Sequence, residues 1–142
     1  MIRVEHSVQI SRSPEDVFVR LSDVERLPEW QSSALEVHAD GPLAQGSRIF
    51  EKRRLMGREL DNELEVVAFD PPRRLTLRSL GGPVKLTIDH ELAAVDGGTL
   101  LTIVASGKAG SLMKLAEPMI ARTAESELRG DFERLKELLE GS

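Results

Sequence analysis

The last segment of the chain, residues 111–142, restricts the possible fold most strongly. Its apolar residues recur mostly at steps of three or four, which is the spacing of one face of an α-helix. A helix of this extent runs about 40 Å at roughly 1.5 Å per residue, so it needs a broad surface to pack on. The apolar positions are Leu112, Leu115, Met119, Ala124, Leu128, Phe132, Leu135 and Leu139.

Pro118 lies inside this helical pattern. Proline has no backbone N–H and its ring clashes with the preceding turn, so it should kink the helix or divide off its first turn. We therefore expect residues 111–117 to form a looser segment.

Seven strands are predicted before this helix, and together they supply the surface that it needs. Residues 2–10 alternate apolar and polar side chains, the two-residue period of a half-buried strand. In the strand at 60–69, Leu64, Val66 and Ala68 should face the interior while acidic side chains face water. Short links rich in Gly, Pro and Asp favour antiparallel neighbours; the remaining strands are predicted at 35–39, 47–56, 75–80, 84–95 and 99–106.

Two short helices are predicted between the first and second strands. Ser13 can cap the first, with Pro14 in the first helical position. Ser22 can cap the second, which Pro28 should disrupt.

This order of elements predicts an α+β fold. We expect a seven-stranded curved antiparallel sheet, two short helices after the first strand, and a long C-terminal helix packed on the concave face. No repeat, low-complexity run or linker divides the chain, and its 142 residues are enough to bury one core. A single domain over residues 1–142 is therefore expected.

The composition argues against several classes of protein. The chain has no cysteine, which excludes disulfides and suits a reducing cytoplasm. It has no apolar run long enough to span a bilayer and no signal-peptide pattern, so we expect a cytoplasmic protein without an integral membrane segment. A net charge of -5 disfavours nucleic-acid binding.

No cofactor or metal is predicted. His6, His38 and His90 do not have the spacing of metal ligands. The sequence also shows no phosphate-binding loop and no pair of nucleophile and base.

Five short runs resemble the START-like helix-grip superfamily, and in particular its polyketide cyclase/dehydrase and lipid-transport (SRPBCC) branch. They are residues 13–18, 27–30, 69–75, 97–99 and 132–138. Each run is a structural signal rather than a functional one, so the resemblance implies the helix-grip fold over nearly the whole chain. Its members include aromatic cyclases, carriers of lipids and quinones, and hormone receptors, so the fold alone does not give the function.

The resemblance implies a ligand between the concave face of the sheet and the long helix. Inward-facing residues are then either pocket wall or plain core, and most of the aliphatic ones would be core. The candidate ligand-binding residues are Trp30, Phe50, Met56, Asn62, Leu64, Leu77, Leu86, Ile88, His90, Leu101, Met113, Met119 and Ile120.

Several of these candidates have a second interpretation. Trp30 should plug the core rather than lean over the pocket, because a lone large aromatic usually serves packing. Met113 and Met119 could line the pocket mouth or simply fill the kink at Pro118. His90 could move a proton for a ligand, although a hydrogen-bonded core histidine is the more common case.

Polar residues near the predicted pocket suggest where a ligand's polar group would lie. Asn62 faces inward in the strand pattern, and Asp131 could join it, depending on the rotation of the helix. Lys52 and Arg54 share the parity of Phe50 and would point inward to receive an acidic group. We favour the alternative that both pair with the acidic outer side of the next strand, because an unpaired buried cation is costly.

Three functions follow from this interpretation. The first is binding or transport of a small hydrophobic or amphipathic ligand, such as a lipid, an isoprenoid or a polyketide-like aromatic, by a monomer or homodimer with a cavity of several hundred cubic ångströms. The second is a cyclase or dehydratase that acts on such a ligand with His90 as a weak catalytic candidate. The third is a protein-interaction module without a ligand, which an exposed apolar patch away from the pocket would favour.

Overall fold

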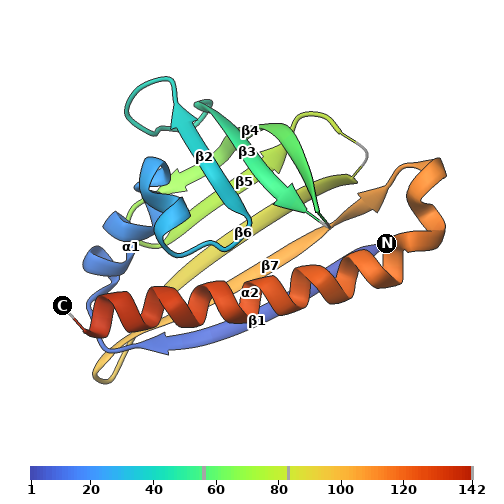
Figure 1. The fold of residues 1–142 in the computed structure, drawn as a ribbon. Helices are drawn as coiled ribbons and strands as arrows, with labels where there is room; N and C mark the ends of the chain where they lie inside the picture. The colour runs from blue at the N-terminus through green and yellow to red at the C-terminus, as the bar shows by residue number, and fades with distance from the viewer. Residues whose placement is uncertain (56, 83, 142) are drawn as a thin grey trace.

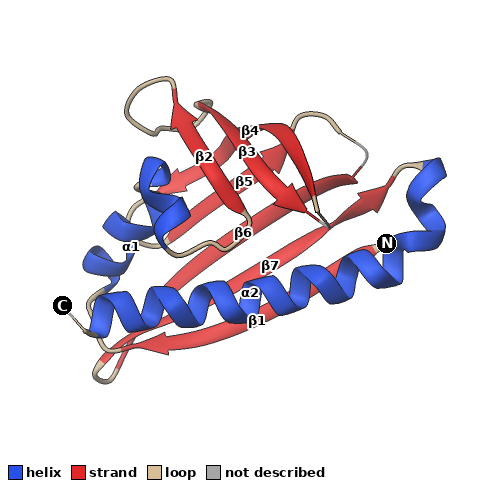
Figure 2. Cartoon of the chain, in the orientation of Figure 1, coloured by secondary structure: helices blue, strands red, loops and turns tan. Residues whose placement is uncertain are grey.

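The chain folds into one curved sheet of strands with helices packed on it (Figure 2). The computed structural model describes residues 1–55, 57–82 and 84–141. The strands are β1 (Ile2–Ile10), β2 (Ala34–Ala39), β3 (Arg48–Leu55), β4 (Arg58–Asp70), β5 (Arg74–Ser79), β6 (Val84–Val95) and β7 (Gly98–Ala109). The α-helices are α1 (Pro14–Ser22) and α2 (Glu117–Glu140), and the 3₁₀ helices are η1 (Val24–Glu29) and η2 (Ser111–Ala116).

The described strands form one antiparallel sheet in the order β1-β7-β6-β5-β4-β3-β2. The chain therefore meanders from β2 to β7 and returns to pair β7 with β1, which fits the short turns between strands. At the β6–β7 turn, Gly97 adopts a φ of 81°, a conformation that side chains with a Cβ rarely take. The α+β helix-grip fold expected from the sequence is confirmed.

The sheet is strongly curved, and β2 and β3 run across the direction of β1 (Figure 1). Irregularities in pairing contribute to this curvature, since an extra residue bends and twists a strand. One lies in β4 between Val66 and Ala68, after which Ala68 pairs with Thr76 and Phe69 with Leu75. Leu75 and Phe69 belong to the core, so the bulge turns Ala68 to the outer side. The predicted inward direction of Ala68 is therefore wrong.

The short helices after β1 pack on the core beside the sheet. The Ser13 hydroxyl accepts a hydrogen bond from the Asp16 backbone N–H at 3.1 Å, which confirms the predicted cap of α1. The prediction that Ser22 caps the second short helix is wrong. Its hydroxyl donates to the Phe18 carbonyl oxygen at 2.7 Å. The hydroxyl thus satisfies a backbone carbonyl in the last turn of α1. η1 begins after Asp23 without a side-chain cap.

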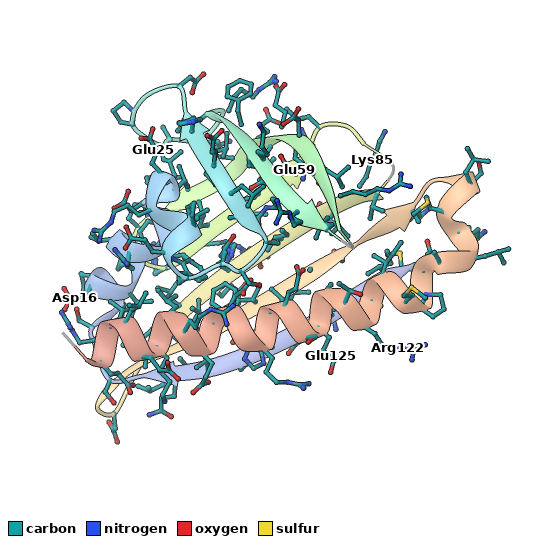
Figure 3. The ribbon with its side chains drawn as sticks, in the orientation of Figure 1. Asp16, Glu25, Glu59, Lys85, Arg122 and Glu125 are labelled. Carbon is teal, nitrogen blue, oxygen red and sulfur yellow. The ribbon has the colours of Figure 1, made fainter. Side chains whose placement is uncertain are left out.

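The long helix α2 lies along β1 and β7 and closes the concave side (Figure 1). Phe132, Leu135 and Leu139 are buried in the main core, and Leu128 packs against it. Arg122 and Glu125 project from α2 away from β3 to β6 (Figure 3). No helix in the described ranges is long and apolar enough to cross a membrane.

Pro118 divides the C-terminal segment, as expected. It occupies the first turn of α2, and the residues before Glu117 form the separate 3₁₀ helix η2. The expected packing of this first part is wrong, because Leu112 and Leu115 are 98% and 99% exposed. Both leucines belong to η2, and this segment between β7 and α2 lies past the end of β7 (Figure 1).

Candidate functional site

A partly enclosed cavity of about 190 Å³ lies between the concave face of the sheet, the end of η1 and the middle of α2. It is smaller than the several hundred cubic ångströms expected from the sequence. Its wall consists of Leu27, Gln31, Ser33, Ile49, Glu51, Arg53, Leu55, Asn62, Leu64, Leu77, Leu86, Ile88, His90, Ala105, Ala124, Glu127, Leu128, Asp131 and Phe132.

The deeper wall of this cavity is apolar. Leu64 of β4, Leu77 of β5 and Ile88 of β6 occupy successive strands of the concave face, and Leu128 and Phe132 of α2 complete the wall. Leu77 pairs directly with Ile88 in the antiparallel register. Burial of such a surface by an apolar guest is favourable by about 25 cal/mol per Å².

A polar wall lies where β3, β4 and the loop after η1 meet. Arg53 is held there by three neighbours. Its Nε lies 2.8 Å from Glu51 Oε1, its Nη1 donates to Ser33 Oγ at 2.8 Å, and its Nη2 donates to Gln31 Oε1 at 2.5 Å. Asn62 Nδ2 also donates to Glu51 Oε1, at 3.4 Å. Each nitrogen of the guanidinium therefore already has a partner.

The helix adds two carboxylates to this wall. Asp131 Oδ1 accepts hydrogen bonds from the Ser32 backbone N–H at 3.0 Å and the Ser32 hydroxyl at 3.1 Å, and it also pairs with Arg134. One turn earlier, burial raises the pKa of the Glu127 carboxyl, and the charge of Asp131 adds to this effect while Arg53 opposes it. Asp131 thus anchors α2 to the loop, whereas Glu127 remains a second acidic group beside it.

His90 is buried in the cavity wall as a neutral imidazole. Its Nδ1 lies 2.9 Å from the Leu75 carbonyl oxygen and must donate to it, because a carbonyl can only accept. Burial lowers the pKa of His90 below its usual range, and this outweighs the hydrogen bond to Leu75 and the charge of Asp89. Asp89 faces the outer side, where it pairs with Arg74 at 2.9 Å. Asp89 therefore does not orient His90 as a base.

The structure brings together part of the predicted ligand-binding set. The candidates in the cavity wall are Asn62, Leu64, Leu77, Leu86, Ile88 and His90. Trp30 and Leu101 are buried in the core outside the wall, and Trp30 packs edge-on against Phe132 with ring centroids 5.0 Å apart. The interpretation of Trp30 as a core plug is therefore confirmed.

Other candidates lie elsewhere. Phe50 is on the outer face and 45% exposed, so its predicted inward direction is wrong. Met119 is 54% exposed, and neither it nor Met113 or Ile120 is in the wall of the cavity. These three residues precede the part of α2 that covers the cavity. Met56 lies outside the described residues.

The error at Phe50 has a simple cause. Ile49 and Phe50 are adjacent and both apolar, so alternation alone fits either direction for β3. In the structure Ile49, Glu51, Arg53 and Leu55 face the cavity, while Lys52 and Arg54 face out. Arg54 pairs with Glu59 of β4 at 3.3 Å, which is the outward pairing that we favoured for it.

The sequence interpretation missed Glu51, Arg53 and Glu127. Two charged side chains, Glu51 and Arg53, occupy inward positions of β3, where apolar residues are usual. Once the direction of β3 is known, their opposite charges at a spacing of two residues indicate a pair on one face.

The outer face has its own shallow depression. It has a volume of about 430 Å³ and lies over β2, β3 and β4, with Glu36, His38, Phe50, Lys52, Asp61 and Glu63 in its wall. These residues form two rows across the strands. In the strand register, Lys52 lies opposite Glu36 and Asp61, and Phe50 lies opposite His38 and Glu63. The depression is larger than the inner cavity but open to water, so it buries a guest less completely. No group of His, Asp, Glu or Cys suited to hold a metal occurs within the described part of the chain.

Comparison with solved structures supports the fold. A protein from Nitrosomonas europaea matches with a TM-score of 0.79 and 19% identity, over 99% of this chain and 95% of that one. A START superfamily protein from Mycobacterium smegmatis matches with a TM-score of 0.83 and 17% identity, over 98% and 97% of the two chains. The di-domain ARO/CYC protein StfQ of the steffimycin biosynthetic pathway matches with a TM-score of 0.84 and 12% identity, over 99% of this chain and 51% of that one.

Sequence comparison identifies the family. No curated protein sequence matches this chain significantly. A family model described as polyketide cyclase / dehydrase and lipid transport, however, matches residues 1–140. The match covers β1 through α2, including every element that builds the cavity. The chain therefore belongs to the polyketide cyclase / dehydrase and lipid transport family and has its START-like helix-grip fold.

Proposed function

We propose that the protein binds a small, mostly apolar molecule in the cavity between the sheet and α2. The observation that carries the proposal is the space left under α2, whose deeper wall is formed by aliphatic and aromatic side chains. Membership of a family that includes lipid transport agrees with this role. Because ligand pockets for drug-sized molecules have volumes of about 300–1,000 Å³, a cavity of about 190 Å³ favours a smaller guest, comparable to one or two fused rings.

Native extraction tests the proposal. The protein is purified without detergent, extracted with organic solvent and analysed by mass spectrometry. We expect a small apolar or amphipathic compound in stoichiometric amount. Binding of an added probe, 2-naphthylmethanol, is then measured by calorimetry.

A filled cavity provides the matched control. Ala124 lies in the wall, so Ala124→Leu should occupy the space and abolish binding while the helix remains intact. Ala121 is a half-buried alanine of the same helix outside the wall, so Ala121→Leu should leave binding unchanged. Equal binding by both variants would contradict the proposed location of the ligand.

A second candidate function is protein interaction through the end of the molecule. Leu112 and Leu115 of η2, together with Met119, expose large apolar side chains away from the cavity. Apolar side chains that gather on an exposed surface often mark an interface. A second copy of the chain is the occupant to test first: Leu112→Ser with Leu115→Ser should convert a dimer to a monomer in sedimentation experiments. A wild-type monomer at all concentrations would contradict self-association.

A further inference from the structure

The polar side of the cavity has one buried oxygen without a hydrogen bond. Glu51 is a cavity-wall residue whose side chain is only 4% exposed. Its Oε1 receives Arg53 and Asn62, but its Oε2 is closed off from water and accepts no hydrogen bond from any residue that the structure describes. An unsatisfied buried carboxylate oxygen is costly, so a donor that reaches it is bound favourably.

Arg53 does not donate to this oxygen in the structure, and most of its hydrogen-bonding capacity is directed to other groups of the protein. Its three nitrogens are directed to Glu51, Ser33 and Gln31 at 2.5 to 2.8 Å. These contacts engage three of the five guanidinium N–H groups, so a ligand carboxylate could use only the remaining two, beside a carboxylate that is already paired with Arg53. The one cation in the described wall of the cavity therefore has its charge paired with Glu51 and most of its donors engaged by the protein.

The net charge of the cavity wall also disfavours an anionic ligand. Glu51, Glu127 and Asp131 contribute three carboxylates against the single guanidinium of Arg53 among the described wall residues. Asp131 is largely satisfied by Ser32 and Arg134, whereas Glu127 adds a further acidic group. An anion entering this space would meet like charges in a partly enclosed site, where repulsion is stronger than in open water.

We propose that the cavity selects ligands whose polar group is a hydrogen-bond donor, such as a hydroxyl or an ammonium, and rejects carboxylates. This inference rests on the proposed function and specifies the chemistry of its ligand. The apolar body of the ligand lies against Leu64, Leu77 and Ile88, and its donor lies toward Glu51. Oε2 is shielded in this structure, so binding of the donor requires the Glu51 carboxylate to turn about its last side-chain bond.

Three probes that share one ring system test the selectivity. Binding of 2-naphthylmethanol, 2-naphthylmethylammonium and 2-naphthoate is measured by calorimetry at pH 7. A hydrogen bond to a charged group changes affinity by about tenfold or more, so the alcohol and the ammonium should bind at least about tenfold more tightly than the carboxylate. Equal or tighter binding of 2-naphthoate would overturn the inference and leave the proposed function intact.

Matched variants locate the selectivity. Glu51→Gln offers an amide N–H and no charge, so the preference over 2-naphthoate should shrink to about threefold or less. Glu59→Gln removes the same charge from an exposed carboxylate on the outer side of β4 (Figure 3) and should leave the preference unchanged. If Glu51→Gln does not fold, as judged by circular dichroism, Glu127→Gln should improve 2-naphthoate binding through charge alone.

The outcomes distinguish a failure of the inferred selectivity from a failure of the proposed binding function. A preference that persists in Glu51→Gln and in Glu127→Gln overturns the assigned role of this wall. Failure of all three probes to bind the wild-type chain contradicts the proposed function, and the inference with it.

Discussion

Phe132 links the core to the cavity through two ring contacts. Its ring centroid lies 5.0 Å from that of Trp30 and 5.9 Å from that of His90. Loss of its side chain would remove a buried aromatic and leave a void beside the cavity. Phe132→Ala should therefore reduce the free energy of unfolding by about 3–5 kcal/mol.

Urea denaturation followed by circular dichroism measures this loss. Leu138 lies on the same helix but is 42% exposed and outside the buried core, so Leu138→Ala should cost clearly less, about 1 kcal/mol, and serves as the control. Similar losses in the two variants would contradict the assignment of Phe132 to the core.

His90 gives the stability a specific dependence on pH. Its pKa is lowered in the folded chain, so below the ordinary value of 6.5 the unfolded chain binds a proton that the folded chain does not. Stability therefore falls as the pH decreases from 6.5 toward the lowered pKa, with a slope of up to about 1.4 kcal/mol per pH unit from this group. Denaturation curves between pH 7 and 5 measure the slope.

His90→Gln isolates this contribution. The raised pKa of Glu127 acts in the opposite direction, since its folded form holds a proton more firmly above pH 4.5. The wild-type chain and the variant share that effect, so the difference between their slopes belongs to His90. Parallel curves for the two proteins would show that His90 is not held neutral by burial.

At the scale of the elements, α2 contains one glycine whose replacement should strengthen it. Gly130 is helical, and a Cβ added there would meet only the Arg134 guanidinium, at 3.8 Å. Because glycine costs about 0.5–1 kcal/mol relative to alanine inside a helix, Gly130→Ala should raise the free energy of unfolding by that amount. Thermal and urea denaturation measure the gain.

Gly107 of β7 provides the opposite case. A Cβ there would come within 2.0 Å of the Lys85 carbonyl oxygen in β6, so Gly107→Ala should separate the two strands and destabilise the chain. An equal effect of the two alanine substitutions would contradict the described packing of α2 and β7.

Sequence patterns predicted the local features of the helices and strands but not the features that depend on tertiary packing. The turns, the cap at Ser13 and the division at Pro118 were predicted because each depends on local backbone chemistry. The direction of β3 was not, because Ile49 and Phe50 fit either face and only the tertiary packing decides between them. The exposure of Leu112 and Leu115 was missed for a related reason: helical spacing identifies an apolar stripe but not where the sheet beneath it ends.

At the scale of the whole molecule, the cavity depends on how closely α2 approaches the sheet. The helix packs along β1 and β7, whereas β3 to β6 lie farther from it (Figure 1). The cavity lies over the concave face of these four strands. Sequence patterns predicted this arrangement but not the volume, which is set by side-chain packing between elements far apart in the chain. Glu51 and Arg53 narrow one side of the space, and this helps explain why it holds only about 190 Å³.

An NMR titration of the ¹⁵N-labelled chain with 2-naphthylmethanol tests the central claim most directly. The account predicts that the largest shifts fall on backbone amides of residues in the cavity wall, such as Leu64, Leu77, Ile88 and Leu128, and that Ala124→Leu abolishes them. Shifts centred on His38 and Phe50 of the outer depression, or no shifts at all, would contradict binding between the sheet and α2.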